Sequence, residues 1–218
     1  MRKGLLLIAL LFTSLLAACI FDGENEEKWE ATKVCPESKQ GTFTDDRDGR
    51  VYKYTTIGNQ VWMAENLNYE FETSFCHYKE DDCDAMGRIY SPKNLDVCPS
   101  GWHVSSWEEW KRLFDQMEID GKDAAGVRLK SANGWSVLNQ EDNPNGTDDC
   151  NFSVIPAFSG NNASYEGYRS VYLTSTDDAE IGGLYGGPVY ITFQSYKPFV
   201  YVANNSDRIE GYVRCVKD

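Results

Sequence analysis

The clearest helix signal in the chain lies in the stretch CPSGWHVSSWEEWKRLFDQM, residues 98–117. Ser106 and Glu109 form a capping box, a pattern that marks the start of a helix. Behind it, apolar residues recur at the three- and four-residue spacing that places them on one helix face. They are Trp107, Trp110, Leu113, Phe114 and Met117. A ligand platform is the alternative, but such a stripe is typical of a core-facing surface. We expect a buried helix that ends before Gly121.

Short β segments flank this helix on both sides. Residues 43–69 alternate as a hairpin should, with its turn at Asp48 and Gly49. A weaker helix is expected over residues 124–130, capped by Asp123. After residue 135, turn-forming runs separate five apolar segments. These segments are FSVIPAF (152–158), SVYLTST (170–176), PVYITFQSY (188–196), PFVYVAN (198–204) and EGYVRCV (210–216). This order predicts a single α+β domain with a mainly antiparallel sheet.

The first 18 residues are typical of a signal peptide. Two basic residues precede an apolar run, residues 4–18, that is shorter than the roughly 20 residues of a membrane-spanning helix. The run ends in LAAC, residues 16–19, which resembles a bacterial lipobox. That resemblance implies cleavage before Cys19 and a lipid anchor on it, with a plain secretory signal as the alternative. Ile20, where Asp would favour retention in the inner membrane, implies the outer membrane.

Residues 19–42 are predicted to be an acidic, solvated tether. Five carboxylates lie among the first ten residues from Phe21, and no apolar periodicity is visible. Such a segment also resembles the surface-export signal of some bacterial groups, although a simple spacer explains it equally well. We therefore place the folded domain at residues 43–218.

Composition limits the partners. The chain has 218 residues, 41% of them hydrophobic, and 34 acidic against 21 basic residues give a net charge of -13. This excess of negative charge argues against nucleic acid, because phosphate recognition depends on cationic contacts. No phosphate-loop or dinucleotide fingerprint is present, so we expect no cofactor.

Six cysteines remain once Cys19 carries lipid, and an even number suits pairing outside the cytoplasm. Six thiols allow 15 connectivities, which spacing alone does not resolve. A metal site at Cys76, His77 and Cys83 is the alternative, but the chain has only one other His and no CxxC pair. An EF-hand at the acidic turn 45–49 also fails, because two required ligand positions are Thr. We expect no metal.

Three stretches together resemble one known family. They are DGRVYKYTTIGNQVWMAENLNY (48–69), GRIYSPKNLDVCPSGWHVSSWEEWKRL (87–113) and GYVRCVKD (211–218). The chain is identified by them as a member of the Fibrobacter succinogenes major paralogous domain family over residues 43–218. Val104 and Ser105 replace the usual Leu-Pro pair, and VYLTST replaces an aromatic-rich strand.

The resemblance implies a fold and a disulfide framework, but no chemistry. The GWH segment with its following helix is similar to C-type-lectin-like and formylglycine-enzyme-like folds, which implies a compact α+β domain with long loops. Together with spacing, it implies three bridges. The expected pairs are Cys76 with Cys83, Cys98 with Cys215, and Cys35 with Cys150.

The sequence contains few signs of a catalytic site. No GxSxG elbow is present, and His103 beside Cys98 is better explained by a structural hydrogen bond than by a catalytic role. Carboxylate pairs for glycoside hydrolysis are uninformative among so many acids. We therefore predict a non-enzymatic protein.

Binding is the favoured class of function. Tyr165, Tyr168 and Tyr185 lie in Gly- and Asn-rich loops, where exposed rings suit stacking on sugars, although loop packing is the alternative. Residues 141–145 resemble the Glu-Pro-Asn loop of calcium-dependent lectins, but the companion Trp-Asn-Asp pattern is missing. We predict a cell-surface lipoprotein of the bacterial outer membrane that binds a glycan or a surface protein. The alternatives are a structural envelope protein and an unrecognised enzyme.

Overall fold

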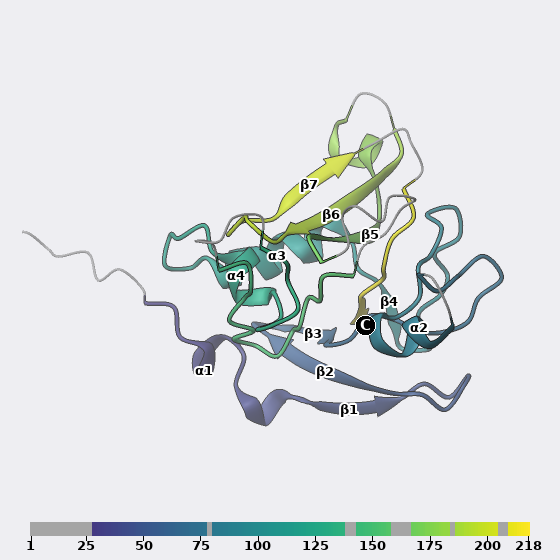
Figure 1. The fold of residues 1–218 in the computed structure, drawn as a ribbon, viewed down its shortest axis with the longest axis horizontal. Helices are drawn as coiled ribbons and strands as arrows, with labels where there is room; N and C mark the ends of the chain where they lie inside the picture. Colours follow the sequence, from purple (N-terminus) through teal and green to yellow (C-terminus); the bar gives the residue numbers. More distant parts are fainter. Residues whose placement is uncertain (1–27, 78–79, 138–142, 158–166, 184–185, 205–208) are drawn as a thin grey trace, which may run out of the picture.

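A computed structural model of the chain describes residues 28–77, 80–137, 143–157, 167–183, 186–204 and 209–218. It contains two antiparallel sheets with the main helix between them (Figure 1). The five-stranded sheet has the order β1 (Gly41–Thr44), β2 (Val51–Ile57), β3 (Gln60–Met63), β8 (Cys215–Lys217) and β4 (Trp102–Val104). The three-stranded sheet has the order β5 (Arg169–Asp177), β6 (Pro188–Gln194) and β7 (Tyr201–Asn204). The predicted α+β class with mainly antiparallel sheets is confirmed.

The helices are short apart from one. They are α1 (Ala31–Val34), α2 (Glu80–Met86), α3 (Trp107–Met117) and α4 (Ala125–Leu129), with 3-10 turns η1 (Glu37–Lys39) and η3 (Asp178–Ile181). The capping box predicted at the start of α3 is present, and Ser106 is its N-cap. For α4 the N-cap is Ala124 rather than the predicted Asp123. Gly126 weakens this helix but is needed there, because a Cβ would lie 2.4 Å from the Pro198 carbonyl oxygen.

The core forms where α3 meets both sheets. Trp110 is fully buried, and its ring lies 4.9 Å from that of Trp62 on β3 and 5.5 Å from that of Tyr172 on β5. Its indole Nε1 donates a hydrogen bond to the Ser105 hydroxyl at 2.8 Å. The stripe of α3 is therefore core rather than a ligand platform, as the periodicity predicts.

The predicted tether is wrong for its described part. Val34 and Cys35 are buried in the core, and β1 pairs with β2 from Gly41 onward. Trp29 donates a hydrogen bond from its indole to the Gln116 carbonyl at 3.0 Å. The segment was predicted to be solvated because its average composition is acidic. Its few apolar residues are nevertheless buried, and this burial holds the segment against the domain. Residues 19–27 lie outside the described residues, as does Cys19.

One predicted strand is also wrong. In residues 152–158, of which 152–157 are described, only Val154 forms an isolated bridge, with Lys130. The carbonyls of Phe152 and Ser153 instead accept hydrogen bonds from the Arg214 guanidinium. Ser153 also has a φ of 53°, which is incompatible with a strand. The segments at 170–176 and 188–196 form β5 and β6 as predicted, whereas β7 begins only at Tyr201 and β8 at Cys215.

Three disulfides connect the chain in the pairs that the family resemblance implied. They join Cys35 to Cys150, Cys76 to Cys83 and Cys98 to Cys215. The first bridges the N-terminal segment to a central loop, and the last joins the middle of the chain to β8. Within the described part of the chain, no helix has the length and apolar character that a membrane crossing requires.

Candidate functional site

A groove of about 730 Å³ opens beside the β1–β2 hairpin. Its walls come from this hairpin, from the end of α2 and from residues 151–155, and its floor includes Asn66 and Arg214. Grooves of this size are typical of small-molecule sites. Five separate parts of the sequence therefore meet at one concave surface.

Arg214 lies beneath the groove as a fully buried cation without a carboxylate partner among the described residues. Its guanidinium donates to four oxygens: Asn66 Oδ1 at 2.8 Å, Met63 O at 3.0 Å, Phe152 O at 2.7 Å and Ser153 O at 2.9 Å. The rings of Phe152 and Tyr172 lie 4.8 and 5.6 Å from its central carbon, where cation–π attraction is significant. Arg214 therefore fixes the wall at residues 152 and 153 from below.

The loop of residues 148–153 is held in an unusual backbone conformation. Asp148, Asn151 and Ser153 have φ values of 50°, 51° and 53°, a region that side chains other than glycine seldom adopt. The Asp148 carboxylate accepts bonds from the Ser153 amide at 2.7 Å and hydroxyl at 2.5 Å. Cys150 is also joined to Cys35. Such strain persists only where surrounding structure enforces it, and it concentrates at functional sites.

The exposed wall of the groove is polar and carries one aromatic ring. Tyr54 is half-buried and lies across Gly41, where a Cβ would come within 2.8 Å of the phenol oxygen. Next to it, the Asn151 amide donates to Gln40 Oε1 at 2.8 Å. Gly41 therefore leaves room for the Tyr54 ring, which faces the groove beside amide groups.

The exposed charges of the groove are paired with one another. Arg50 contacts Asp84 at 3.1 Å, and Lys53 contacts Glu65 at 3.4 Å. Asp84 and Glu65 are thus each paired with a cation that also lines the groove. The groove offers a neutral, hydrogen-bonding surface rather than a strongly charged one.

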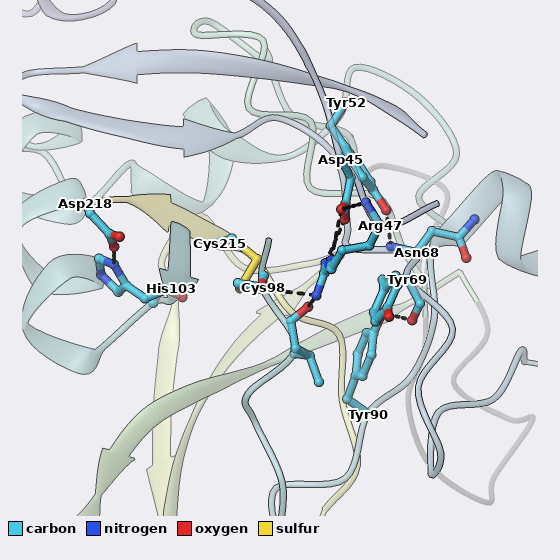
Figure 2. The surroundings of a disulfide bond; sticks show 12 residues. Asp45, Arg47, Tyr52, Asn68, Tyr69, Tyr90, Cys98, His103, Cys215 and Asp218 are labelled. Atoms are coloured by element: carbon cyan, nitrogen blue, oxygen red, sulfur yellow. Dashed lines mark hydrogen bonds and ion pairs between the residues drawn. A yellow bond between two sulfur atoms is a disulfide. The ribbon is translucent and has the colours of Figure 1, made fainter. Parts of the chain in front are cut away.

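The groove residues do not form a nucleophile with a base. No His lines it, and the Ser153 hydroxyl donates to the Asp148 carboxylate instead of to an imidazole. His103 lies outside the groove, on β4, where Figure 2 shows it beside the C-terminal residue Asp218. Its Nδ1 lies 2.6 Å from Asp218 Oδ1 and its Nε2 lies 2.7 Å from Glu109 Oε1. With both nitrogens occupied by carboxylates, His103 joins the C-terminus to α3, which is the structural role that its sequence context favours.

The His103 contacts predict a pH dependence of stability. Burial acts to lower the pKa of His103, but the hydrogen bonds to Asp218 and Glu109 outweigh it and raise the pKa above 6.5. A raised pKa in the folded state means that the stabilisation is present below pH 6.5 and is lost as the pH rises past that value. Because the imidazole is 43% exposed, the effect is expected to stay below about 1 kcal/mol.

Urea unfolding of the wild type and of His103→Gln between pH 5.5 and 8.5 measures this effect. The wild type is expected to lose its advantage over the variant as the pH rises. Equal free-energy profiles for the two proteins would contradict the prediction.

The acidic turn before β2 is held by an arginine, as Figure 2 shows. Arg47 contacts Asp45 Oδ2 at 2.7 Å, donates to the Val97 carbonyl at 2.8 Å and lies 3.7 Å above the Tyr69 ring. Burial acts to raise the pKa of Asp45, but hydrogen bonds from Arg47 lower it overall. The Asp45 carboxylate is therefore paired with Arg47, and the segment forms the turn expected at Asp48 and Gly49.

Residues of the other two candidate metal sites form a disulfide or hydrogen bonds within the protein. Cys76 and Cys83 are bonded to each other, which leaves no thiolate as a ligand. In the described part of the lectin-like loop, the Pro144 carbonyl accepts from Lys130 Nζ at 2.8 Å, and Asn145 Oδ1 accepts from the Trp135 amide at 3.1 Å. Among the described residues, no group of three metal-binding side chains occurs.

Of the three tyrosines in the predicted binding surface, the structure describes Tyr168. Tyr168 is half-buried, and its hydroxyl donates to the Val137 carbonyl at 3.4 Å. It does not line the groove. Tyr165 and Tyr185 lie outside the described residues. Sequence reasoning missed the groove because its residues come from distant segments; the short polar side chains around WMAENLNY were the only available signal.

One of the three comparisons with known proteins identifies a family. A sequence model of the Fibrobacter succinogenes major domain matches residues 55–217. No curated protein and no solved structure is significantly similar to the chain. The similarity to C-type lectins therefore stays a prediction. The match runs from the end of β2 to β8 and includes the groove residues from Ala64 onward, whereas the groove residues 40–54 of the β1–β2 hairpin precede it. The chain belongs to the Fibrobacter succinogenes major domain family.

Proposed function

We propose that this protein is a non-enzymatic lipoprotein of the bacterial cell surface, anchored in the outer membrane through Cys19, whose domain binds a neutral glycan in the groove. The observation that carries the binding site is the strained loop 148–153 beside the groove. Two of the three residues with a positive φ, Asn151 and Ser153, line the groove, and a chain that needed only a stable core would have no reason to maintain such conformations there.

The chemistry of the walls favours sugar over peptide or nucleic acid. Asn and Gln amides and the Tyr54 ring suit hydroxyl groups and the apolar face of a pyranose. Among the described residues that line the groove, the exposed cations Arg50 and Lys53 are each already paired with a carboxylate, which disfavours a carboxylate or phosphate ligand. The net charge of -13 further disfavours acidic polymers.

A glycan array of neutral and acidic chains, followed by calorimetric titration, tests this proposal on the mature protein. Tyr54→Ala is expected to weaken binding of a neutral glycan about tenfold or more, because the loss of a stacking ring costs about 1.4 kcal/mol or more. Tyr168→Ala is the matched control and is expected to bind like the wild type.

Two results would overturn the proposed site. An array on which the wild type binds no glycan removes the function itself. Binding that survives Tyr54→Ala but is lost in the triple variant Tyr165→Ala, Tyr168→Ala and Tyr185→Ala moves the site to the tyrosine loops.

A further inference from the structure

A second, smaller cavity of about 360 Å³ continues the groove. The two cavities share four lining residues: Arg50, Asn68, Cys83 and Asp84. Beyond these, the smaller cavity is lined by Asp48, Tyr69, Glu70 and Arg88. A ligand that fills the groove and extends past this junction would therefore enter the second cavity.

Asn68 is the side chain placed to contact such a ligand. It is only 7% exposed, yet its side-chain amide forms no hydrogen bond within the described part of the chain. Figure 2 shows the amide turned away from the Tyr52 hydroxyl, to which the backbone N–H of Asn68 donates at 3.0 Å. Neither the nitrogen nor the oxygen of this amide is among the buried side-chain atoms that lack a partner, so the amide is accessible from the two cavities that Asn68 lines.

The backbone around Asn68 holds this amide in position. Leu67 donates its N–H to the Val213 carbonyl at 3.0 Å, and Asn66 donates its amide to the Met86 carbonyl at 2.7 Å. Asn66 Oδ1 also accepts from the Tyr172 hydroxyl at 3.0 Å. The neighbouring asparagine is therefore consumed by the fold, whereas Asn68 is left available at the junction.

We propose that Asn68 is a specificity-determining residue that hydrogen-bonds a second sugar unit, so that the groove selects a linear glycan chain over a single sugar. This inference rests on the proposed function. The amide provides two donors and one acceptor, which match neighbouring hydroxyls on one pyranose ring. A ligand too short to reach Asn68 does not form these hydrogen bonds, and that difference creates the discrimination by length.

Calorimetric titration with cello-oligosaccharides and xylo-oligosaccharides of one to six units tests the inference on the full mature protein. These chains are linear and uncharged, so length is the only variable within each series. In the wild type, Kd is expected to fall at least tenfold once a chain is long enough to pass the junction. In Asn68→Ala this gain with length is expected to disappear.

Asn68→Asp keeps the side-chain shape but removes both donors, and it is expected to lose most of the gain. Asn133→Ala, at an exposed asparagine outside both cavities, is the matched control and should retain it. Because the Asn68 amide supports no other side chain, urea unfolding of Asn68→Ala should match that of the wild type.

The outcomes separate this inference from the proposed function. Neutral-glycan binding that depends on Tyr54 but shows no gain with length, or an equal gain in Asn68→Ala, overturns the role of Asn68 and leaves the proposed function standing. If neither the cello-oligosaccharides nor the xylo-oligosaccharides bind, the role of Asn68 is also overturned. The proposed function is decided separately, by the glycan array.

Discussion

Arg214→Met is expected to lower the free energy of unfolding by at least about 4 kcal/mol, among the largest effects of a single substitution. Methionine fills a similar apolar volume but donates no hydrogen bond. It therefore leaves the carbonyls of Met63, Phe152 and Ser153 without the guanidinium donor, whereas Asn66 Oδ1 keeps its hydrogen bond from the Tyr172 hydroxyl. Each buried, unsatisfied group costs about 1–3 kcal/mol.

The same substitution is expected to abolish binding in the groove, because the wall at residues 152 and 153 loses its support. Urea unfolding followed by tryptophan fluorescence measures the stability. Arg112→Met, at an exposed position on α3, is the matched control and should change stability by no more than about 0.5 kcal/mol. A loss below about 1 kcal/mol in Arg214→Met would show that the guanidinium does not hold this loop.

Removal of the Cys35–Cys150 bridge by paired substitution with Ala is expected to cost about 5 kcal/mol. The bridge closes a separation of 115 residues, and the loop-closure entropy that it removes from the unfolded chain grows with that length. The same double substitution at Cys76 and Cys83, which are separated by 7 residues, is expected to cost only about 2 kcal/mol.

Hydrogen exchange should locate the damage as well as measure it. Without the Cys35–Cys150 bridge, faster exchange is expected in α1, in β1 and in the loop of residues 148–153. Without the Cys76–Cys83 bridge, these segments should exchange at wild-type rates. Equal losses of stability in the two double variants would exclude loop length as the main cause.

The sequence predicted α3 and the first hairpin correctly because their signals act over a few residues. A capping box joins positions three apart, and the stripe of Trp110, Leu113 and Met117 repeats at helical spacing. The segment after residue 152 shows where such patterns fail. Its apolar residues resemble a strand, but its carbonyls are taken by Arg214, which lies about sixty positions further along the chain.

The N-terminal segment was misread for a related reason. Its acidic residues outnumber Trp29, Val34 and Cys35, so its average composition resembles a solvated spacer. A few apolar contacts and one disulfide are nevertheless enough to hold it, because each acts at a particular site in the core. An average composition does not show which individual residues pack in the core.

Family membership and the α+β class follow from motifs that can be read in the chain itself, since turn residues, caps and short motifs depend on near neighbours. The groove follows from contacts between residues 40–54, 64–68, 83–87, 151–155 and 214, which come together only when the sheets close around α3. The availability of the Asn68 amide is likewise a property of the folded protein, because Asn66 and Asn68 look alike in the sequence and only their surroundings distinguish them.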